Sequence, residues 1–197
     1  MIITVTQLGP QPGHERRLKI SRDFSLWVAM SAGRQGITVR GRQLYPHLRK
    51  IDLSSVLNAA ESITPVEFSN WHKTSVEDLA RSLDLPAGWA AKLINMILKV
   101  RVYVGREGPS ALLGLLHPPI DNRLVDEILE RYPKRNADHL ELRRLCELGK
   151  PIKRMKTYDD YLNVIRGVRM VADREGCTLF EVESLWCVED ESGSADF

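Results

Sequence analysis

Apolar residues recur at helical spacing along most of the chain, and Gly and Pro residues separate the runs. Residues 14–32 place Leu18, Trp27 and Val28 at intervals typical of a helix. Residues 158–176 form a long amphipathic segment that ends at Gly176. Only the stretch IITVTQL near the start alternates, as a short strand or extended arm does. The pattern therefore predicts an almost all-α protein.

Cap residues and breaks divide the remaining pattern into further helices. Asp52, Pro65 and Asp121 have the residue types that begin helices, and Thr74 with Glu77 has the spacing of a capping box. We expect one domain over residues 1–190, with two lobes that meet near residues 84–121, and a disordered acidic tail over residues 191–197. The expected helices cover residues 53–63, 66–73, 74–83, 88–104, 111–116, 121–132, 138–149 and 178–189.

Charge is distributed unevenly, although the formal net charge is only +2. The first quarter of the chain and residues 134–156 are basic, and acidic residues gather near the end. Clustered Lys and Arg side chains permit an anionic partner, since they neutralise phosphates and release counterions. Two solvated faces explain the same pattern.

Several classes of protein are disfavoured by composition. The three cysteines form no CxxC pair and predict neither a disulfide framework nor a zinc or iron–sulfur site. The first residues lack the layout of a signal peptide, and no apolar run has the length of a membrane span. We therefore expect a soluble cytoplasmic protein that needs no metal and does not insert into membranes.

Residues 75–99 have the layout of a helix–hairpin–helix, with a short turn in LDLPAGWAAKLINMILK. In that motif, backbone N–H groups of the turn and of the second helix point at a DNA phosphate. Gly88 suits such a close approach because it has no side chain. A plain pair of antiparallel helices explains the same pattern without DNA.

Two lysines follow the turn on roughly the same helix face, Lys92 and, seven residues later, Lys99. A lysine amine held in a site can act as a nucleophile. Alternatively, both side chains run along a mostly buried helix and keep their charges in water.

Asp121 follows the sequence HPPI, where the next helix begins. As an N-cap it stabilises that helix by about 1 kcal/mol, which is a sufficient structural role. It can also be a carboxylate that activates a nucleophile or stabilises a developing cation. His117 and Trp71 have structural interpretations as well, and Trp89 in the turn can either pack in the core or stack on a base.

The order of these features resembles the helix–hairpin–helix DNA glycosylase superfamily. PAGWAAKLINMILK is similar to the hairpin and lysine helix of its bifunctional members, and PPIDNRL to their aspartate-bearing loop. The nearest resemblance is to the archaeal 8-oxoguanine DNA glycosylases, which carry two lysines seven residues apart and then a Pro-h-Asp-x-Arg element. The resemblance covers roughly residues 75–130. Two features depart from it: the turn reads LPAGW instead of Gly-h-Gly, and a long interval separates Lys92 from Asp121.

The resemblance implies a two-lobed helical bundle around a central hairpin that acts as a monomer, without cofactor or metal, on double-stranded DNA with a flipped modified base. Lys92 would attack the sugar, with Lys99 as the alternative nucleophile, and Asp121 would assist. DNA contacts would come from the residues Gly88, Trp89, Ala90 and Arg123, and the site would be lined by His117 and Trp71.

Two biological settings fit such an enzyme: repair of oxidised bases, and defence against phage DNA with modified bases such as glucosylated hydroxymethylcytosine. The strand-nicking lyase step is a separate expectation from base release. Two other classes of function also fit the sequence, a non-catalytic DNA-binding module and a helical protein-interaction domain.

Overall fold

The computed structural model describes residues 13–34, 36–37, 39, 41–59 and 62–185, and these residues form helices and loops with no strand among them. The all-α prediction is therefore confirmed for this part of the chain. The expected N-terminal strand and the acidic tail lie outside the described residues. None of the described helices is long and apolar enough to cross a membrane.

The helices follow one another with short connections. The α-helices are α1 (His14–Gly33), α2 (Gly41–Arg49), α3 (Ser54–Leu57), α4 (Pro65–Leu83), α5 (Ala87–Leu98), α6 (Asn122–Arg131), α7 (Leu140–Glu147) and α8 (Tyr158–Glu175). The shorter or irregular helices are the π-helix η1 (Lys99–Val104) and the 3₁₀ helices η2 (Ser110–Leu115), η3 (Ala137–His139), η4 (Ile152–Arg154) and η5 (Phe180–Leu185).

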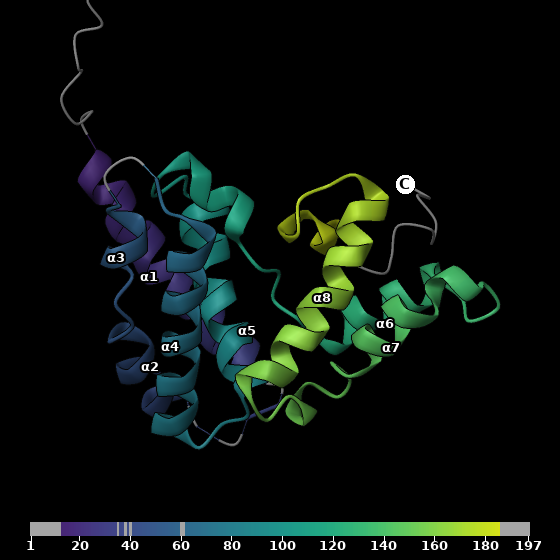
Figure 1. Ribbon diagram of the computed structural model, residues 1–197. Coiled ribbons are helices and arrows are strands. Elements are labelled where there is room, and N and C mark those ends of the chain that lie inside the picture. The colour runs from purple at the N-terminus through teal and green to yellow at the C-terminus, as the bar shows by residue number, and fades with distance from the viewer. Residues whose placement is uncertain (1–12, 35, 38, 40, 60–61, 186–197) are drawn as a thin grey trace, which may run out of the picture.

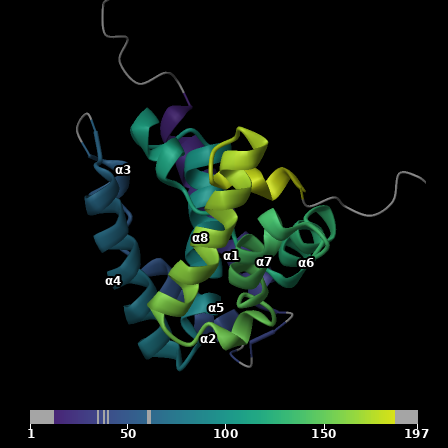
Figure 2. The same cartoon turned by 45° about the vertical axis from the view of Figure 1, so that its right-hand side comes forward.

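Helix α5 lies between two groups of helices (Figures 1 and 2). On one side it packs against α1 and α4, and on the other it contacts α8 and η4. Helices α6, α7 and α8 pack on one another in the second group. The apolar character of α5 follows from this position, since ten of its twelve residues are buried.

Helix α4 begins at a capping box that involves Thr64 and Glu67. The Thr64 side chain accepts from the Glu67 N–H at 3.2 Å, and the Glu67 carboxylate accepts from the Thr64 N–H at 2.8 Å. The predicted helix start at Thr74 is wrong, because α4 runs without a break from Pro65 to Leu83. Val76 and Leu79 are buried against the core, and this burial continues the helix past the Thr74–Glu77 signal.

The second helix of the hairpin continues through η1 to Val104, as the apolar pattern predicts. The last part is a π-helix that begins at Lys99. Such segments are uncommon and often occur near functional sites. The 3₁₀ helix η2 then leads to the loop before α6, so the long interval between Lys92 and Asp121 contains η1 and η2 together with their connecting loops.

Candidate active site

Lys92 and Asp121 meet, although 29 residues separate them in the sequence. The Lys92 Nζ lies 3.4 Å from the Asp121 Oδ2. Lys92 is in the second turn of α5, and Asp121 is the residue that caps α6. The side chains retain 13% and 31% of their exposure, so the pair is mostly shielded but open to solvent.

The two oxygens of Asp121 have different contacts. Oδ1 accepts the N–H of Leu124 at 2.9 Å, which is the N-cap hydrogen bond of α6. Oδ2 faces the amine of Lys92. The cap therefore orients the carboxylate while one oxygen faces the lysine, so a structural role for Asp121 does not exclude a chemical one.

Lys92 also lies over the face of Trp89, with 5.3 Å between the Nζ and the ring centroid. A cation at this distance is attracted by the negative face of the indole ring. The contact limits the positions open to the amine and keeps it near Asp121.

Lys99 has a carboxylate partner of its own. Its Nζ lies 2.6 Å from Oε1 of Glu183, which is 84 residues away on η5. Burial raises the pKa of Glu183, and Lys99 opposes this shift. Because Lys99 is held in this short ion pair, Lys92 is the better-placed candidate nucleophile.

A small cleft of about 200 Å³ lies beside these four charged groups. The helices α1, α5, η1, α6 and η5 and the loop before α6 supply its walls. Ser31 from α1 belongs to the lining, and its buried Oγ has no hydrogen-bond partner. A buried unpartnered hydroxyl costs free energy, which a bound polar ligand can recover. The lining residues are Ser31, Ala32, Lys92, Met96, Lys99, Pro119, Asp121, Leu124 and Glu183.

A buried polar network holds the loop that presents Asp121. The side chain of Asn95, one turn after Lys92, donates to the carbonyl of Pro118 at 3.2 Å. It also donates to the hydroxyl of Tyr161 at 3.0 Å. These bonds join α5, the loop before α6 and α8, so they set where Asp121 lies relative to Lys92.

Two neutral histidines complete this network. Asn95 uses its amide hydrogens elsewhere, so its Oδ1 accepts the Nε2–H of His72 at 2.9 Å. The Nδ1 of His72 then accepts the hydroxyl proton of Tyr158 at 2.9 Å. The Tyr161 hydroxyl donates in turn to Nδ1 of His117 at 2.9 Å.

Burial lowers the pKa of His72 to about 4, although its bond to Asn95 acts in the opposite direction. Burial also lowers the pKa of His117 well below its usual value, and the positive charge of Arg169 and the neighbouring His72 ring act in the same direction. His117 was expected to line the site, but it is buried in the network and lies outside the lining of the cleft. Its role is to support the loop from within the core.

The predicted DNA-contacting residues of the hairpin are covered. Gly88, Trp89 and Ala90 are all buried. The N–H of Gly88 donates to the carbonyl of Met155 at 3.0 Å, so it is not free for a phosphate. A Cβ on Gly88 would lie 2.7 Å from the carbonyl oxygen of Ile152. Gly88 is thus required for close packing, and the prediction that these three residues face DNA is wrong for this conformation.

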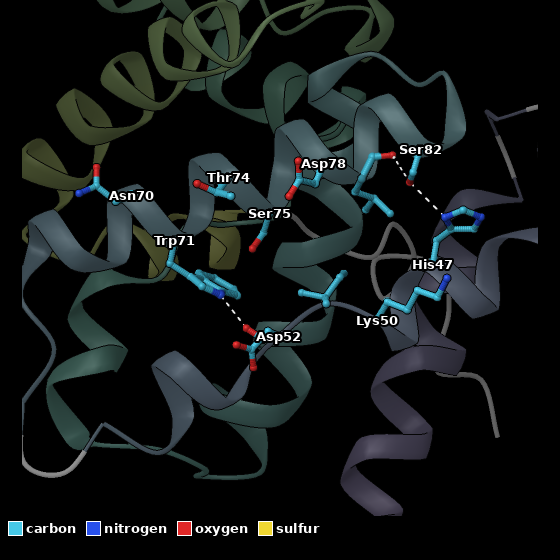
Figure 3. A pocket seen from close by; sticks show the side chains of 11 residues that line it. His47, Lys50, Asp52, Asn70, Trp71, Thr74, Ser75, Asp78 and Ser82 are labelled. Carbon is cyan, nitrogen blue, oxygen red and sulfur yellow. Dashed lines mark hydrogen bonds between the residues drawn. The ribbon is translucent and has the colours of Figure 1, made fainter.

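Trp71 lies at a different cavity of about 710 Å³, between α2 and α4 (Figure 3). Its indole N–H donates to the backbone carbonyl of Asp52 at 2.7 Å. The prediction that Trp71 lines the site of Lys92 is therefore wrong. Arg123 is exposed in the first turn of α6, where a contact with DNA remains a prediction.

The larger cavity is a poorer candidate for chemistry than the small cleft. His47 and Ser82 are 3.1 Å apart there (Figure 3). However, Ser82 donates its own proton to the carbonyl of Leu79, so His47 does not act as its base in this arrangement. The Asp52 carboxylate accepts hydrogen bonds from the backbone N–H and the hydroxyl of Ser54, and Asp78 pairs with Arg81.

Sequence reasoning missed three residues of the site: Ser31, Asn95 and Glu183. Glu183 was counted with the acidic end of the chain, although its position between buried Val182 and partly buried Leu185 signals a packed helix. Asn95 carries a usable signal, since a polar residue in an otherwise apolar helix requires buried partners. Ser31 has no signal in the sequence.

Comparison with protein-family models, curated proteins and solved structures found no match. Within the described residues, no group of three or more His, Cys, Asp or Glu side chains is arranged to hold a metal ion.

Proposed function

We propose that this protein is a DNA glycosylase with lyase activity, which excises an oxidised or otherwise modified base. The observation that carries the proposal is the 3.4 Å approach of Lys92 to Asp121 beside a small cleft. The pair places a potential nucleophile, the Lys92 amine, beside a proton acceptor, the Asp121 carboxylate, which a helix cap holds in position. The resemblance of residues 75–130 to helix–hairpin–helix glycosylases supports the same assignment.

In this mechanism the target nucleotide leaves the duplex and its base enters the cleft. Asp121 accepts a proton from Lys92, and the neutral amine attacks C1′ of the sugar. The bond between C1′ and the base breaks, and its electron pair leaves with the base, which takes up a proton. The proton on Asp121 passes through water to the departing base, and the restored carboxylate stabilises the positive charge that develops on the sugar ring, because a charge held close to the reacting carbon acts without reorganisation.

Strand cleavage follows from the covalent intermediate. Ring opening converts the amine adduct into a Schiff base between Lys92 and C1′. Loss of a proton from C2′ then expels the 3′ phosphate by β-elimination, and water releases the lysine. Every step uses groups that Lys92, Asp121, DNA and water supply.

The size of the cleft favours a compact base. Its volume of about 200 Å³ lies below the roughly 300–1,000 Å³ of pockets for drug-sized ligands. The cleft also offers both hydrogen-bond donors and acceptors, from Lys99, Glu183 and the unpartnered Ser31. An oxidised base suits this site better than a glucosylated one, so damage repair is favoured over defence against glucosylated DNA. Duplexes that each carry one modified base, scored for released base, distinguish the two substrates.

Borohydride trapping on a duplex with an abasic site tests the proposal. Borohydride reduces the Schiff base and leaves the protein covalently bound to DNA. We expect the wild type to crosslink, Lys92→Ala to lose crosslinking entirely and Lys99→Ala to retain it. If Lys99→Ala abolishes the crosslink and Lys92→Ala does not, Lys99 is the nucleophile.

The same assay separates the alternative functions. A non-catalytic DNA-binding module binds the duplex but never crosslinks, and a protein-interaction domain does neither. Base release without crosslinking would leave a glycosylase that uses water as nucleophile and has no lyase step.

A further inference from the structure

The loop Gly149–Thr157 covers the hairpin turn where a phosphate contact was expected. Gly88 donates its N–H to Met155, and Ala87 donates its N–H to the carbonyl of Lys156 at 3.3 Å. These N–H groups at the start of α5 are therefore taken by backbone carbonyls. A DNA phosphate that approaches this end of α5 meets the loop first.

The two faces of this loop differ in character. Ile152 and Met155 are buried against the start of α5. Lys153, Arg154 and Lys156 are exposed between and beside them. The loop contains no acidic residue, and within the described residues none of these three cations forms an ion pair. Arg154 donates one N–H to the backbone carbonyl of Lys150 at 3.1 Å. A carbonyl does not neutralise the guanidinium, so the three charges remain available to an external anion.

The loop also contacts both helices of the candidate catalytic pair, α5 with Lys92 and α6 with its N-cap Asp121. Gly88 beneath it is four residues before Lys92, or about 6 Å along a helix axis. At its other end, Lys150 pairs with Asp126 of α6, about 7.5 Å along the axis from Asp121. Phosphates repeat every few ångströms along DNA. When one nucleotide of a DNA strand enters the cleft, the phosphates next to it therefore lie within reach of the loop.

We propose that the Gly149–Thr157 loop binds the DNA backbone, with Lys153, Arg154 and Lys156 contacting phosphates beside the flipped nucleotide. These side chains make the phosphate contacts that were expected from the hairpin N–H groups, because those N–H groups donate to carbonyls of the loop. The proposal rests on the proposed function for the identity of the partner as DNA. It differs from the sequence-based prediction in the residues that make the contact.

The test measures affinity for a 20-base-pair duplex that carries a stable abasic-site analogue, at several salt concentrations. The variant replaces all three cations: Lys153→Gln, Arg154→Gln and Lys156→Gln. Each lost phosphate contact lowers the slope of log Kd against log salt by about 0.9. If all three contacts are made, the wild type should lose about 40-fold more affinity than the variant between 50 and 200 mM salt.

A matched control removes three exposed cations at the far end of α1: Arg16→Gln, Arg17→Gln and Lys19→Gln. The segment after α1 lies against Trp89, since a Cβ on Gly36 would overlap its ring. A helix of 20 residues is about 30 Å long, so the control residues are far from the loop. The control should keep the wild-type salt slope. Loss of the slope in the control and its retention in the loop variant would overturn the proposal.

A second variant keeps the charges and excludes a folding defect: Lys153→Arg, Arg154→Lys and Lys156→Arg. It should bind DNA nearly as the wild type does, and thermal melting of all variants should agree. Retained affinity and slope in the Gln variant, with normal borohydride trapping, overturns the loop proposal and leaves the glycosylase intact. A wild type that binds duplex through the loop but never traps overturns the glycosylase and leaves the loop proposal standing. A wild type that does not bind duplex overturns both.

Discussion

At the scale of single residues, the site depends on one aspartate that serves two purposes. Oδ1 of Asp121 caps α6 through Leu124, and Oδ2 faces Lys92. Asparagine can keep the first contact, since it is as good an N-cap as aspartate. It cannot perform the second, because an amide neither accepts a proton readily nor balances a positive charge.

Asp121→Asn should therefore separate stability from chemistry. We expect a free energy of unfolding within about 1 kcal/mol of the wild type and unchanged DNA affinity, with base excision lowered by orders of magnitude. Urea unfolding and single-turnover excision measure the two effects. Asp121→Ala is the control that loses both cap and charge. Wild-type excision by the Asn variant would rule out a catalytic carboxylate at this position.

At the scale of elements, the start of α5 packs closely against the Gly149–Thr157 loop. The only side chain that fits at position 88 is a hydrogen atom, because a Cβ would lie 2.7 Å from the Ile152 carbonyl oxygen and 2.7 Å from the Met155 Cε. The methionine can move, but the backbone oxygen can move only with the loop. This contact fixes how η4 and its flanking residues sit on α5.

Gly88→Ala should lower the free energy of unfolding by about 1–3 kcal/mol, the usual cost of overpacking a tight site. Gly114→Ala is the matched control, since a Cβ there meets nothing within 4 Å. Its effect should be within about 1 kcal/mol and can be stabilising. Chemical denaturation of both variants provides the comparison. Equal stability of the two would mean that the loop does not press on Gly88 in solution.

At the scale of the whole molecule, the buried network makes stability depend on pH. His72 and His117 join α4, the loop before α6 and α8 as neutral rings. In the unfolded chain a histidine has a pKa of about 6.5, whereas folding lowers the pKa of His72 to about 4. Between these values the unfolded state binds more protons, so stability rises with pH.

The stability contributed by a neutral His72 should be complete above pH 6.5 and fall as the pH drops towards 4. A shift of this size corresponds to about 3 kcal/mol, and His117 acts in the same direction. Urea unfolding at pH 7, 6, 5 and 4 measures the change. A midpoint that stays constant from pH 7 to pH 4.5 would contradict the neutral network.

The sequence by itself predicted most of the longer helices and several of their ends, but it did not predict α2. The apolar period predicted α1, the α5–η1 helix and α8, while Asp121 and Gly176 marked ends that the structure confirms. Caps and periodicity act between residues three or four apart, so a local pattern contains the information they need. The expected helix start at Thr74 is wrong because burial of α4 overrides that local signal. The helix expected over residues 53–63 is also wrong in extent, since α3 covers only Ser54–Leu57 among the described residues.

Tertiary structure alone decided which side chains meet. It pairs Lys99 with Glu183 across 84 residues, places Trp71 at another cavity and buries His117 in a polar network. It also covers Gly88 with a loop more than 60 residues later in the chain. These contacts depend on how helices cross and which faces they bury, and a helix of given amphipathicity can pack in several ways. Local periodicity therefore placed Lys92 and Asp121 on their helices, whereas the packing of α5 against α8 and against the loop before α6 set the distance between them.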